Sequence, residues 1–549
     1  MDPFDEINIG DCRIKNRIAM APMISNLAGT DGNTNEVHTS YLAERAKGGY
    51  GLIITEYSFV PSIRSRGSRN QLSFARQDQI PGFKRLSETV HGYGSKIFAQ
   101  LVHAGGKAIT EKGDGPLAPS PVEYMGRMAQ ELTTEQINDI AEAFSVSASI
   151  AEKSGFDGIE LHGAHGYLIH EFLSPALNSR KDRYGGSFEA MLTFPKEIIK
   201  RVRESVSIPV GIRLSLYEDD ADGYTPEHGI RVAESLKGLD YIHFSAGRNA
   251  PPGSSAPFYY PKANIAQKIF SKPGIPTMVV GSITDRDSLH KALEFADMVS
   301  MGRGALADPF FPEKIRKGMI PRPCIRCNQG CRDLAYGQVR CTINYSTGRE
   351  TLVPSYTLDG EVTIAGAGAA GMEAAIYLAR CGMKVTVLEK TGEIGGQLND
   401  IKEERHFYEF HRIVEYYKYE AERLGIVIKF HTEAKPDQVD LWLADGKRYD
   451  SIPTGKEIYV DSLAFSALDE AITLSGNSRI TMTERSLTSM DRSRQAVYRE
   501  MALKKGIVFV KEPDEKLSSG TFQGKQEDLG SAVRRGVSEA IRYAGMKIH

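Results

Sequence analysis

The feature that most constrains the fold is a series of eight short apolar runs, each followed by helix-like sequence, within the first 305 of 549 residues. The runs are continuous rather than alternating, which is typical of parallel strands buried on both faces. They cover residues 17–22, 51–56, 96–101, 158–162, 210–215, 241–246, 277–282 and 298–303. Eight strand-then-helix units over roughly 300 residues predict an α/β fold that begins with a (β/α)8 (TIM) barrel. We place this barrel at residues 1–320.

The carboxyl ends of these runs carry polar residues and glycines, and in this fold that end of the barrel holds the active site. The residues are Pro22, Glu56, Gln100, His162, Arg213, Ser245, Gly281 with Ser282, and Gly302 with Arg303. Glycines there let a phosphate approach backbone N–H groups, and an arginine adds a bidentate partner. Gln100 and Arg213 have side chains suited to the polar edge of a flat ring. The pattern predicts a phosphate-bearing ligand over the barrel mouth, although each residue alone is equally well explained as a structural loop end.

The segment HGAHGYL follows the fourth run and brings three further candidates, His162, His165 and Tyr167. A lone histidine is more often structural than catalytic, so the argument depends on the group. Two imidazole donors polarise a carbonyl oxygen as negative charge develops on it. A phenol beside them can deliver a proton. The segment therefore predicts a catalytic site that acts on a carbonyl compound.

Six motifs in this order resemble those of the old yellow enzyme family of FMN oxidoreductases: NRIAMAPM, FAQLVHAGGKA, HGAHGYL, NSRKDRYGGS, VGIRLS and MGRGALADP. The resemblance implies that His162 and His165 hold a substrate carbonyl and that Tyr167 protonates the α-carbon. It also implies that hydride passes from the flavin N5 to the β-carbon. The implied FMN-binding residues are Pro22, Met23, Tyr57, Gln100, Arg213, Gly281, Ser282, Gly302 and Arg303.

Four of the six cysteines fall within eighteen positions, in the pattern C-x2-C-x3-C-x9-C. They are Cys324, Cys327, Cys331 and Cys341. Four thiolates suit a four-iron (4Fe–4S) cluster, and a structural zinc is the alternative. The flanks CNQGC and CTINYSTGRE resemble the cluster loop of the longer branch of the family, which includes 2,4-dienoyl-CoA reductase, 2-enoate reductase and trimethylamine dehydrogenase. This resemblance favours an iron–sulfur segment at residues 321–355.

Residues 356–549 are predicted to form a Rossmann-like nucleotide-binding region. Gly366, Gly368 and Gly371 make a G-x-G-x-x-G pattern that follows a strand and opens a helix, and Glu389 ends the next strand. This context is typical of a dinucleotide site, with pyrophosphate at the helix N-terminus and the carboxylate on a ribose. GEIGGQL, with Gln397, resembles the second FAD contact loop of the family. The region is expected to bind FAD or an ADP-like nucleotide, the alternative being a structural role.

Residues 456–500 keep the strand–helix–strand order in which members of the family carry a second glycine motif for NAD(P)H, but the glycines of that motif are missing here. Asp461, Ser462 and Leu463 stand where small residues let the backbone meet a pyrophosphate. We therefore expect NAD(P)H not to bind this half in the usual way. Electrons would then arrive from an electron-transfer protein, or a nicotinamide would reduce FMN at the barrel.

The resemblance leads to two hypotheses. The first is a flavin- and iron–sulfur-dependent reductase of an activated C=C bond in an enoyl-CoA, a 2-enoate or an enone. The second is an amine dehydrogenase or N-demethylase of the trimethylamine dehydrogenase type, which passes electrons to a protein acceptor. Against the second, no cysteine follows Pro22 to attach a flavin. An aromatic cage for an amine could still be built from Tyr57, Tyr259 and Tyr260.

The overall composition excludes several classes of protein. A net charge of -2 gives no electrostatic case for nucleic acid or for an anionic membrane. No run of 18 apolar residues is present to span a bilayer. The N-terminus has acidic residues where a signal peptide needs basic ones, so we expect a cytoplasmic protein that acts on a small molecule. The family resemblance implies self-association into a homo-oligomer.

Overall fold

The computed structural model describes residues 1–111, 114–124, 126–218, 220–248, 273–331, 334, 337–401, 404–444, 457–460, 465–488, 492–511 and 529–548. The chain forms two compact units. Unit 1 comprises Met1–Pro321 and Leu334–Val339, and unit 2 comprises Arg322–Asp333 and Arg340–His549. The boundaries of the three-part division near residues 320 and 355 remain predictions.

Unit 1 contains a closed barrel of eight parallel strands, which confirms the predicted fold class. The barrel strands are β3 (Ile18–Met20), β4 (Leu52–Ile54), β6 (Lys96–Val102), β11 (Gly158–Gly163), β12 (Val210–Ser215), β13 (Tyr241–Ser245), β14 (Thr277–Val280) and β15 (Met298–Met301). β11 pairs with both β6 and β12, and β15 pairs with β3, so the ring has no open edge. One short strand, β5 (Ser58–Phe59), pairs with the carboxyl end of β6 and extends the sheet near the mouth.

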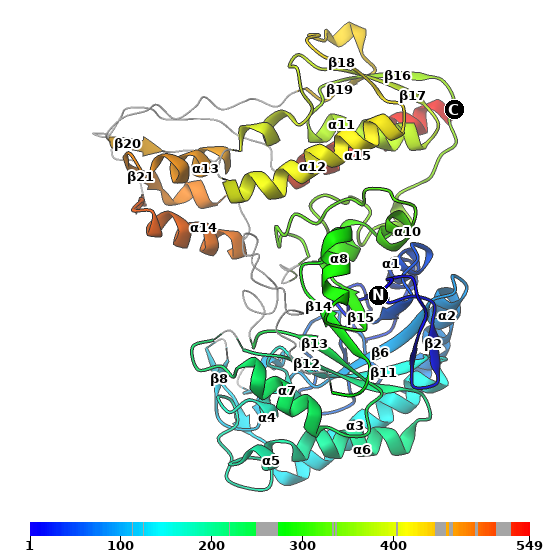
Figure 1. Cartoon of the computed structure of the whole chain (residues 1–549), viewed down its shortest axis with the longest axis vertical. Coiled ribbons are helices and arrows are strands. Elements are labelled where there is room, and N and C mark those ends of the chain that lie inside the picture. Colours follow the sequence, from blue (N-terminus) through cyan, green and yellow to red (C-terminus); the bar gives the residue numbers. More distant parts are fainter. Residues whose placement is uncertain are drawn as a thin grey trace. The chain divides into compact units, whose positions relative to one another are not determined.

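Helices surround these strands (Figure 1). They are α1 (Glu36–Lys47), α2 (Ile80–His91), α3 (Thr134–Lys153), α4 (Leu168–Leu173), α5 (Phe188–Met191), α6 (Thr193–Ser205), α7 (Pro226–Ser235), α8 (Arg286–Leu293), α9 (Arg303–Ala307) and α10 (Phe311–Arg316). α3 begins where the Thr133 side chain accepts a hydrogen bond from the N–H of Gln136, and Asp285 caps α8 through Ser288 in the same way. Such caps satisfy amides that the first helical turn leaves unpaired. Local sequence therefore defines where these helices start.

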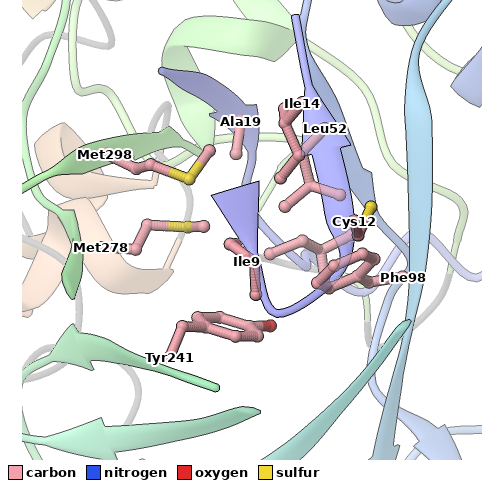
Figure 2. Packing of buried hydrophobic residues seen from close by; sticks show 10 residues of the cluster. Ile9, Cys12, Ile14, Ala19, Leu52, Phe98, Tyr241, Met278 and Met298 are labelled. Atoms are coloured by element: carbon pink, nitrogen blue, oxygen red, sulfur yellow. The ribbon is translucent and has the colours of Figure 1, made fainter. Parts of the chain in front are cut away.

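A hairpin of β1 (Ile7–Ile9) and β2 (Cys12–Ile14) fills the amino-terminal end of the barrel. Ile9 and Ile14 pack against Leu52, Phe98 and Tyr241, which lie near the starts of their strands (Figure 2). These side chains are fully buried and form an apolar floor. Only the carboxyl ends of the strands are then left to build a site for a ligand.

Unit 2 is built on two parallel sheets. The first has the order β18 (Val427–Lys429), β17 (Lys384–Leu388), β16 (Glu361–Ala365), β19 (Leu441–Trp442), and it packs with α11 (Ala369–Arg380), α12 (Glu404–Arg423) and α15 (Leu529–Ile548). The second has the order β20 (Glu457–Val460), β21 (Arg479–Thr483), β22 (Val508–Val510), with α13 (Phe465–Leu474) and α14 (Arg492–Lys504). α15 lies closely on α11, since a Cβ at Gly536 would fall 2.1 Å from the carbonyl oxygen of Ala370. Within the described residues, no helix combines the length and apolarity needed to cross a membrane.

Candidate active site

Strand register gathers the predicted residues of unit 1 at the carboxyl end of the barrel. His162 on β11 lies beside Arg213 on β12, and Gln100 on β6 lies beside Glu160 on β11. The ring of Tyr57 is 5.9 Å from that of His162 and 5.1 Å from that of Tyr167, measured between centroids. Residues from separate segments of the sequence therefore meet at one mouth.

Gln100 and Arg213 each bury a polar atom that has no hydrogen-bond partner among the described residues. The Nε2 of Gln100 donates to Glu160 Oε1 at 2.7 Å, but its Oε1 is unpaired. The terminal nitrogens of Arg213 make only long contacts of 3.4 Å to Pro22 O and Ser245 Oγ, and its Nε is unpaired. Buried unpaired groups are costly. A free acceptor and a free donor complement the N–H and C=O groups of a flavin edge, so these residues fit FMN.

Burial and nearby positive charge keep both site histidines neutral. Burial, followed by Arg213, lowers the pKa of His162 and of His165 well below the usual range. His162 Nδ1 accepts from the N–H of Ala164 at 3.3 Å, which leaves the proton on Nε2. His165, held in a left-handed backbone conformation (φ 60°), places its Nε2 2.7 Å from Ser245 Oγ. His162 therefore presents an imidazole N–H donor, as oxyanion stabilisation requires.

Tyr167 stands at the start of α4, half-buried, between His162 and a cation. Its ring centroid lies 4.8 Å from that of His162 and 5.5 Å from the Nζ of Lys107. That ammonium donates to the backbone oxygens of His165 at 2.5 Å and Arg248 at 2.8 Å. A nearby positive charge favours the phenolate that remains after a phenol gives up its proton. The arrangement suits Tyr167 to proton donation.

The ends of the last two strands carry the glycines that the sequence predicts as phosphate-binding. Gly281 and Ser282 both have positive φ angles, of 150° and 51°. Gly302 precedes α9, and a Cβ there would lie 2.7 Å from the Sδ of Met23. A side chain at residue 302 would therefore require the Met23 side chain to move. The contact links Met23 with the loop that carries Arg303.

Two residues that sequence reasoning missed contribute to this mouth. Lys107 follows the third strand in the AGGK turn, and its charge close to the strand end was an available signal. Glu160 is a single acid inside the apolar run GIELH, and it is completely buried. A carboxylate at a core position needs partners, and those partners come from strands distant in sequence.

The four clustered cysteines all belong to unit 2. Three are buried, Cys341 is half-buried, and none of them forms a disulfide. Burial, then Cys327 and Cys324, raises the pKa of Cys341 to about 12. In the parts of the chain that the structure describes, no group of three or more His, Cys, Asp or Glu side chains is arranged to hold a metal ion. The iron–sulfur cluster therefore stays a prediction, which depends on four thiols in one loop and on the resemblance of their flanking sequence to the family.

The three glycines of the dinucleotide motif have different reasons to be glycine. Gly366 has a φ of 94°, which favours glycine. A Cβ at Gly371 would lie 1.8 Å from the carbonyl oxygen of Gly366, so the helix could not pack there. A Cβ at Gly368 would meet only the Cα of Gly396, at 4.0 Å. Among the described residues, no atom requires glycine at 368, and the space suits an approaching pyrophosphate.

Glu389 closes this motif from the end of β17. Its Oε2 accepts from the N–H of Ala367 and its Oε1 from the N–H of Thr391, each at 2.8 Å. Oε1 also accepts from the Thr391 hydroxyl at 2.8 Å, whereas Oε2 keeps a second lone pair that a ribose hydroxyl could use. Gly395 pairs with Gly368, which brings the loop carrying Gln397 onto the turn. These residues fit an adenine dinucleotide.

Two predictions concern residues outside the described part of the chain. The lost glycines at Asp461, Ser462 and Leu463 belong to this group. So do Tyr259 and Tyr260, the candidate members of an aromatic cage.

Comparisons with known proteins agree with this architecture. Residues 2–321 match the NADH:flavin oxidoreductase / NADH oxidase family, and residues 364–420 match an NAD(P)-binding Rossmann-like domain. An NADH oxidase of Thermoanaerobacter brockii is 40% identical over 418 residues, which are 72% of this chain and 64% of that protein. A cinnamate reductase of Clostridium sporogenes is 32% identical over 498 residues, which are 80% of this chain and 72% of that protein. The chain thus spans less than two thirds of the length of the first relative.

Among solved structures, the fold is similar to that of a 2-naphthoyl-CoA reductase in complex with 2-naphthoyl-CoA. The TM-score is 0.88 at 22% sequence identity, and the match covers 98% of this chain and 99% of that one. Similarity at this level of identity concerns the fold and extends over both units of the chain.

Proposed function

Because the chain belongs to the NADH:flavin oxidoreductase / NADH oxidase family, as its resemblance to the old yellow enzymes predicted, we propose that it reduces an activated C=C bond by means of FMN. The substrate would be an enoyl thioester, a 2-enoate or an enone. The observation that carries the proposal is the unpaired Gln100 Oε1 and Arg213 Nε, buried at the mouth that also presents His162 and Tyr167. The carboxyl end of the barrel would then bind both the polar edge of the flavin and the carbonyl group of the substrate.

The residues at the barrel mouth would have separate roles in the reaction. FMN, when bound, supplies the hydride for the β-carbon of the substrate. The neutral His162 donates its Nε2 proton to the substrate carbonyl oxygen, and this bond strengthens as the oxygen becomes negative. Tyr167 delivers a proton to the α-carbon. Lys107 stabilises the phenolate that Tyr167 becomes, because its ammonium stays 5.5 Å from the ring.

The second unit would supply electrons. Cys324, Cys327, Cys331 and Cys341 would hold a four-iron cluster, which moves electrons singly. Gly366, Gly368, Gly371 and Glu389, with Gln397, would hold FAD or an ADP-like nucleotide. An electron-transfer protein or NAD(P)H would reduce the enzyme. Location in the cytoplasm and self-association belong to the same proposal.

The amine dehydrogenase hypothesis has less support. Met23 and Ile24 follow Pro22, so no thiol is present there to attach a flavin. Tyr57 packs against His162 and Tyr167, which supports a role for it in an ene-reductase site. The similarity to a cinnamate reductase points in the same direction.

The test is anaerobic. The purified protein is assayed for iron, FMN and FAD, reduced with dithionite to the flavin level, and mixed in turn with cinnamate, a medium-chain enoyl-CoA and cyclohexenone. Reoxidation of the flavin by one of these, with the saturated product identified, supports the proposal. A flavin that no C=C compound reoxidises, but that trimethylamine or dimethylglycine reduces, refutes it in favour of amine oxidation.

A further inference from the structure

A buried carboxylate lies next to the predicted flavin-binding residues. Glu160 is 0% exposed and accepts three hydrogen bonds. The donors are Gln100 Nε2 at 2.7 Å, Tyr241 Oη at 2.8 Å and His243 Nδ1 at 2.9 Å. His243 Nε2 lies 2.7 Å from Ser300 Oγ. Two other strands, β6 and β13, thus supply donors to one acid that the mechanism above does not use, and β15 contacts it indirectly through His243.

The side chain of Tyr241, one of the donors to Glu160, is closely packed. Tyr241 belongs to the apolar floor of the barrel, and a Cβ at Gly211 would lie 2.0 Å from its ring. Gly211 stands beside both Glu160 and Tyr241 in the strand register, so its missing side chain makes room for the phenol. The phenol fits against this glycine and donates its hydroxyl proton to the Glu160 carboxylate at 2.8 Å.

Glu160 determines which way the Gln100 amide points. A carboxylate accepts hydrogen bonds and does not donate them. The amide nitrogen of Gln100 must therefore face Glu160, and the amide oxygen is the atom left unpaired. A bound flavin would therefore always meet the amide oxygen of Gln100, which is a hydrogen-bond acceptor.

Glu160 also carries a negative charge next to Arg213. Burial alone would raise the pKa of Glu160, but His243, Arg213 and Tyr241 together hold it below its usual range. Burial lowers the pKa of His243 while Glu160 raises it, and Arg213 is a second cation that lowers the pKa of Glu160. The guanidinium keeps its charge, since burial brings its pKa only to about 10.

We propose that Glu160 is a positioning residue that orients the Gln100 amide and weakens the positive field of Arg213, and so sets the relative affinity of the protein for oxidised and reduced FMN. The inference rests on the proposed function. Reduction adds negative charge to the flavin, and a carboxylate near the ring disfavours that form. Removing the charge should strengthen the binding of reduced FMN relative to oxidised FMN.

The test compares Glu160→Gln with wild-type holoenzyme. Glutamine keeps the shape and can still accept from Gln100, but it carries no charge and can also donate. FMN dissociation is measured by equilibrium dialysis under oxidising and under dithionite-reducing conditions, with released FMN separated from other flavins by chromatography. We expect the ratio of reduced to oxidised dissociation constants to fall by about tenfold, which for two electrons is a rise of about 30 mV in potential.

Three controls separate charge from structure. Tyr241→Phe removes one hydrogen bond but keeps the charge, and Asp157→Asn removes a half-buried carboxylate just before the amino-terminal end of β11. Both variants should keep the wild-type ratio. Glu160→Asp keeps the charge but withdraws it from Gln100, so it should bind both forms less tightly at a nearly unchanged ratio. If Glu160→Gln does not fold, Glu160→Asp still tests the positioning role. Wild-type binding of both oxidised and reduced FMN by Glu160→Asp would contradict that role.

The outcomes are distinct. An unchanged ratio in Glu160→Gln, or an equal shift in Asp157→Asn, overturns the inference while the proposed function stands. Wild-type protein that binds no FMN overturns the proposed function and the inference with it.

Discussion

Gly368 and Gly371 provide a matched pair that separates ligand space from protein packing. Both belong to the G-x-G-x-x-G motif of unit 2, and both become alanine with the addition of one methyl group. The methyl at residue 371 would lie 1.8 Å from a backbone oxygen, whereas the methyl at residue 368 would have its nearest neighbour at 4.0 Å. Gly368 has φ −74° and ψ −177°, an extended conformation that alanine adopts without strain.

These distances give different expected magnitudes. Gly371→Ala forces helix α11 away from β16, and overpacking of this kind costs about 1–3 kcal/mol of unfolding free energy. Gly368→Ala should change the unfolding free energy by less than about 0.5 kcal/mol. Its methyl group instead occupies the space through which a pyrophosphate reaches the backbone. We expect at least tenfold weaker FAD binding from Gly368→Ala, in a protein that remains as stable as the wild type.

The assay uses the full chain of both variants. FAD and FMN are quantified after release, and unfolding is followed by urea titration with FAD removed, so that loss of ligand does not appear as loss of stability. FMN content serves as the internal control, because its proposed site lies in unit 1. Wild-type FAD content in Gly368→Ala would refute the assignment of this space to a pyrophosphate. Equal destabilisation of the two variants would refute the packing argument.

Three further predictions concern both units. Tyr167→Phe should keep FMN but lower kcat with an enone substrate by about 10²- to 10⁴-fold, because the proton donor is lost; an unchanged kcat would rule out this role. Cys331→Ala should lose iron while FMN stays bound, with Cys381→Ala as a matched control that keeps its iron; a full iron complement in Cys331→Ala would contradict the ligand assignment. Burial raises the pKa of Glu171 from its usual 4.5 to about 8, so the folded chain retains a proton that the unfolded chain releases. The free energy of unfolding should therefore fall as pH rises between these values, and Glu171→Gln should remove on the order of 1–3 kcal/mol of that fall; parallel pH profiles from urea titrations of the two proteins would contradict this.

The barrel and its catalytic end could be predicted from the sequence, because both follow from local patterns. Continuous apolar runs identify strands buried on both faces, and eight of them leave few alternatives to a closed barrel. Polar residues at the ends of such runs must lie at one mouth, since parallel strands all point the same way. That reasoning alone placed Gln100, His162 and Arg213 together. The glycine motif was equally local, since a strand, a turn and a helix follow one another in the chain.

The tertiary structure decided how these groups are used. The tautomer of His162, the orientation of the Gln100 amide and the charge of Glu160 depend on partners from strands far apart in sequence. Residue spacing along one strand does not specify which atom of a neighbouring strand lies within hydrogen-bond distance. Register and rotamer set those distances, and both result from the packing of the whole barrel. The sequence by itself determined which chemical groups reach the mouth, and only the folded structure decided which of their atoms remain free to bind, because a buried polar atom is available only when no neighbour satisfies it.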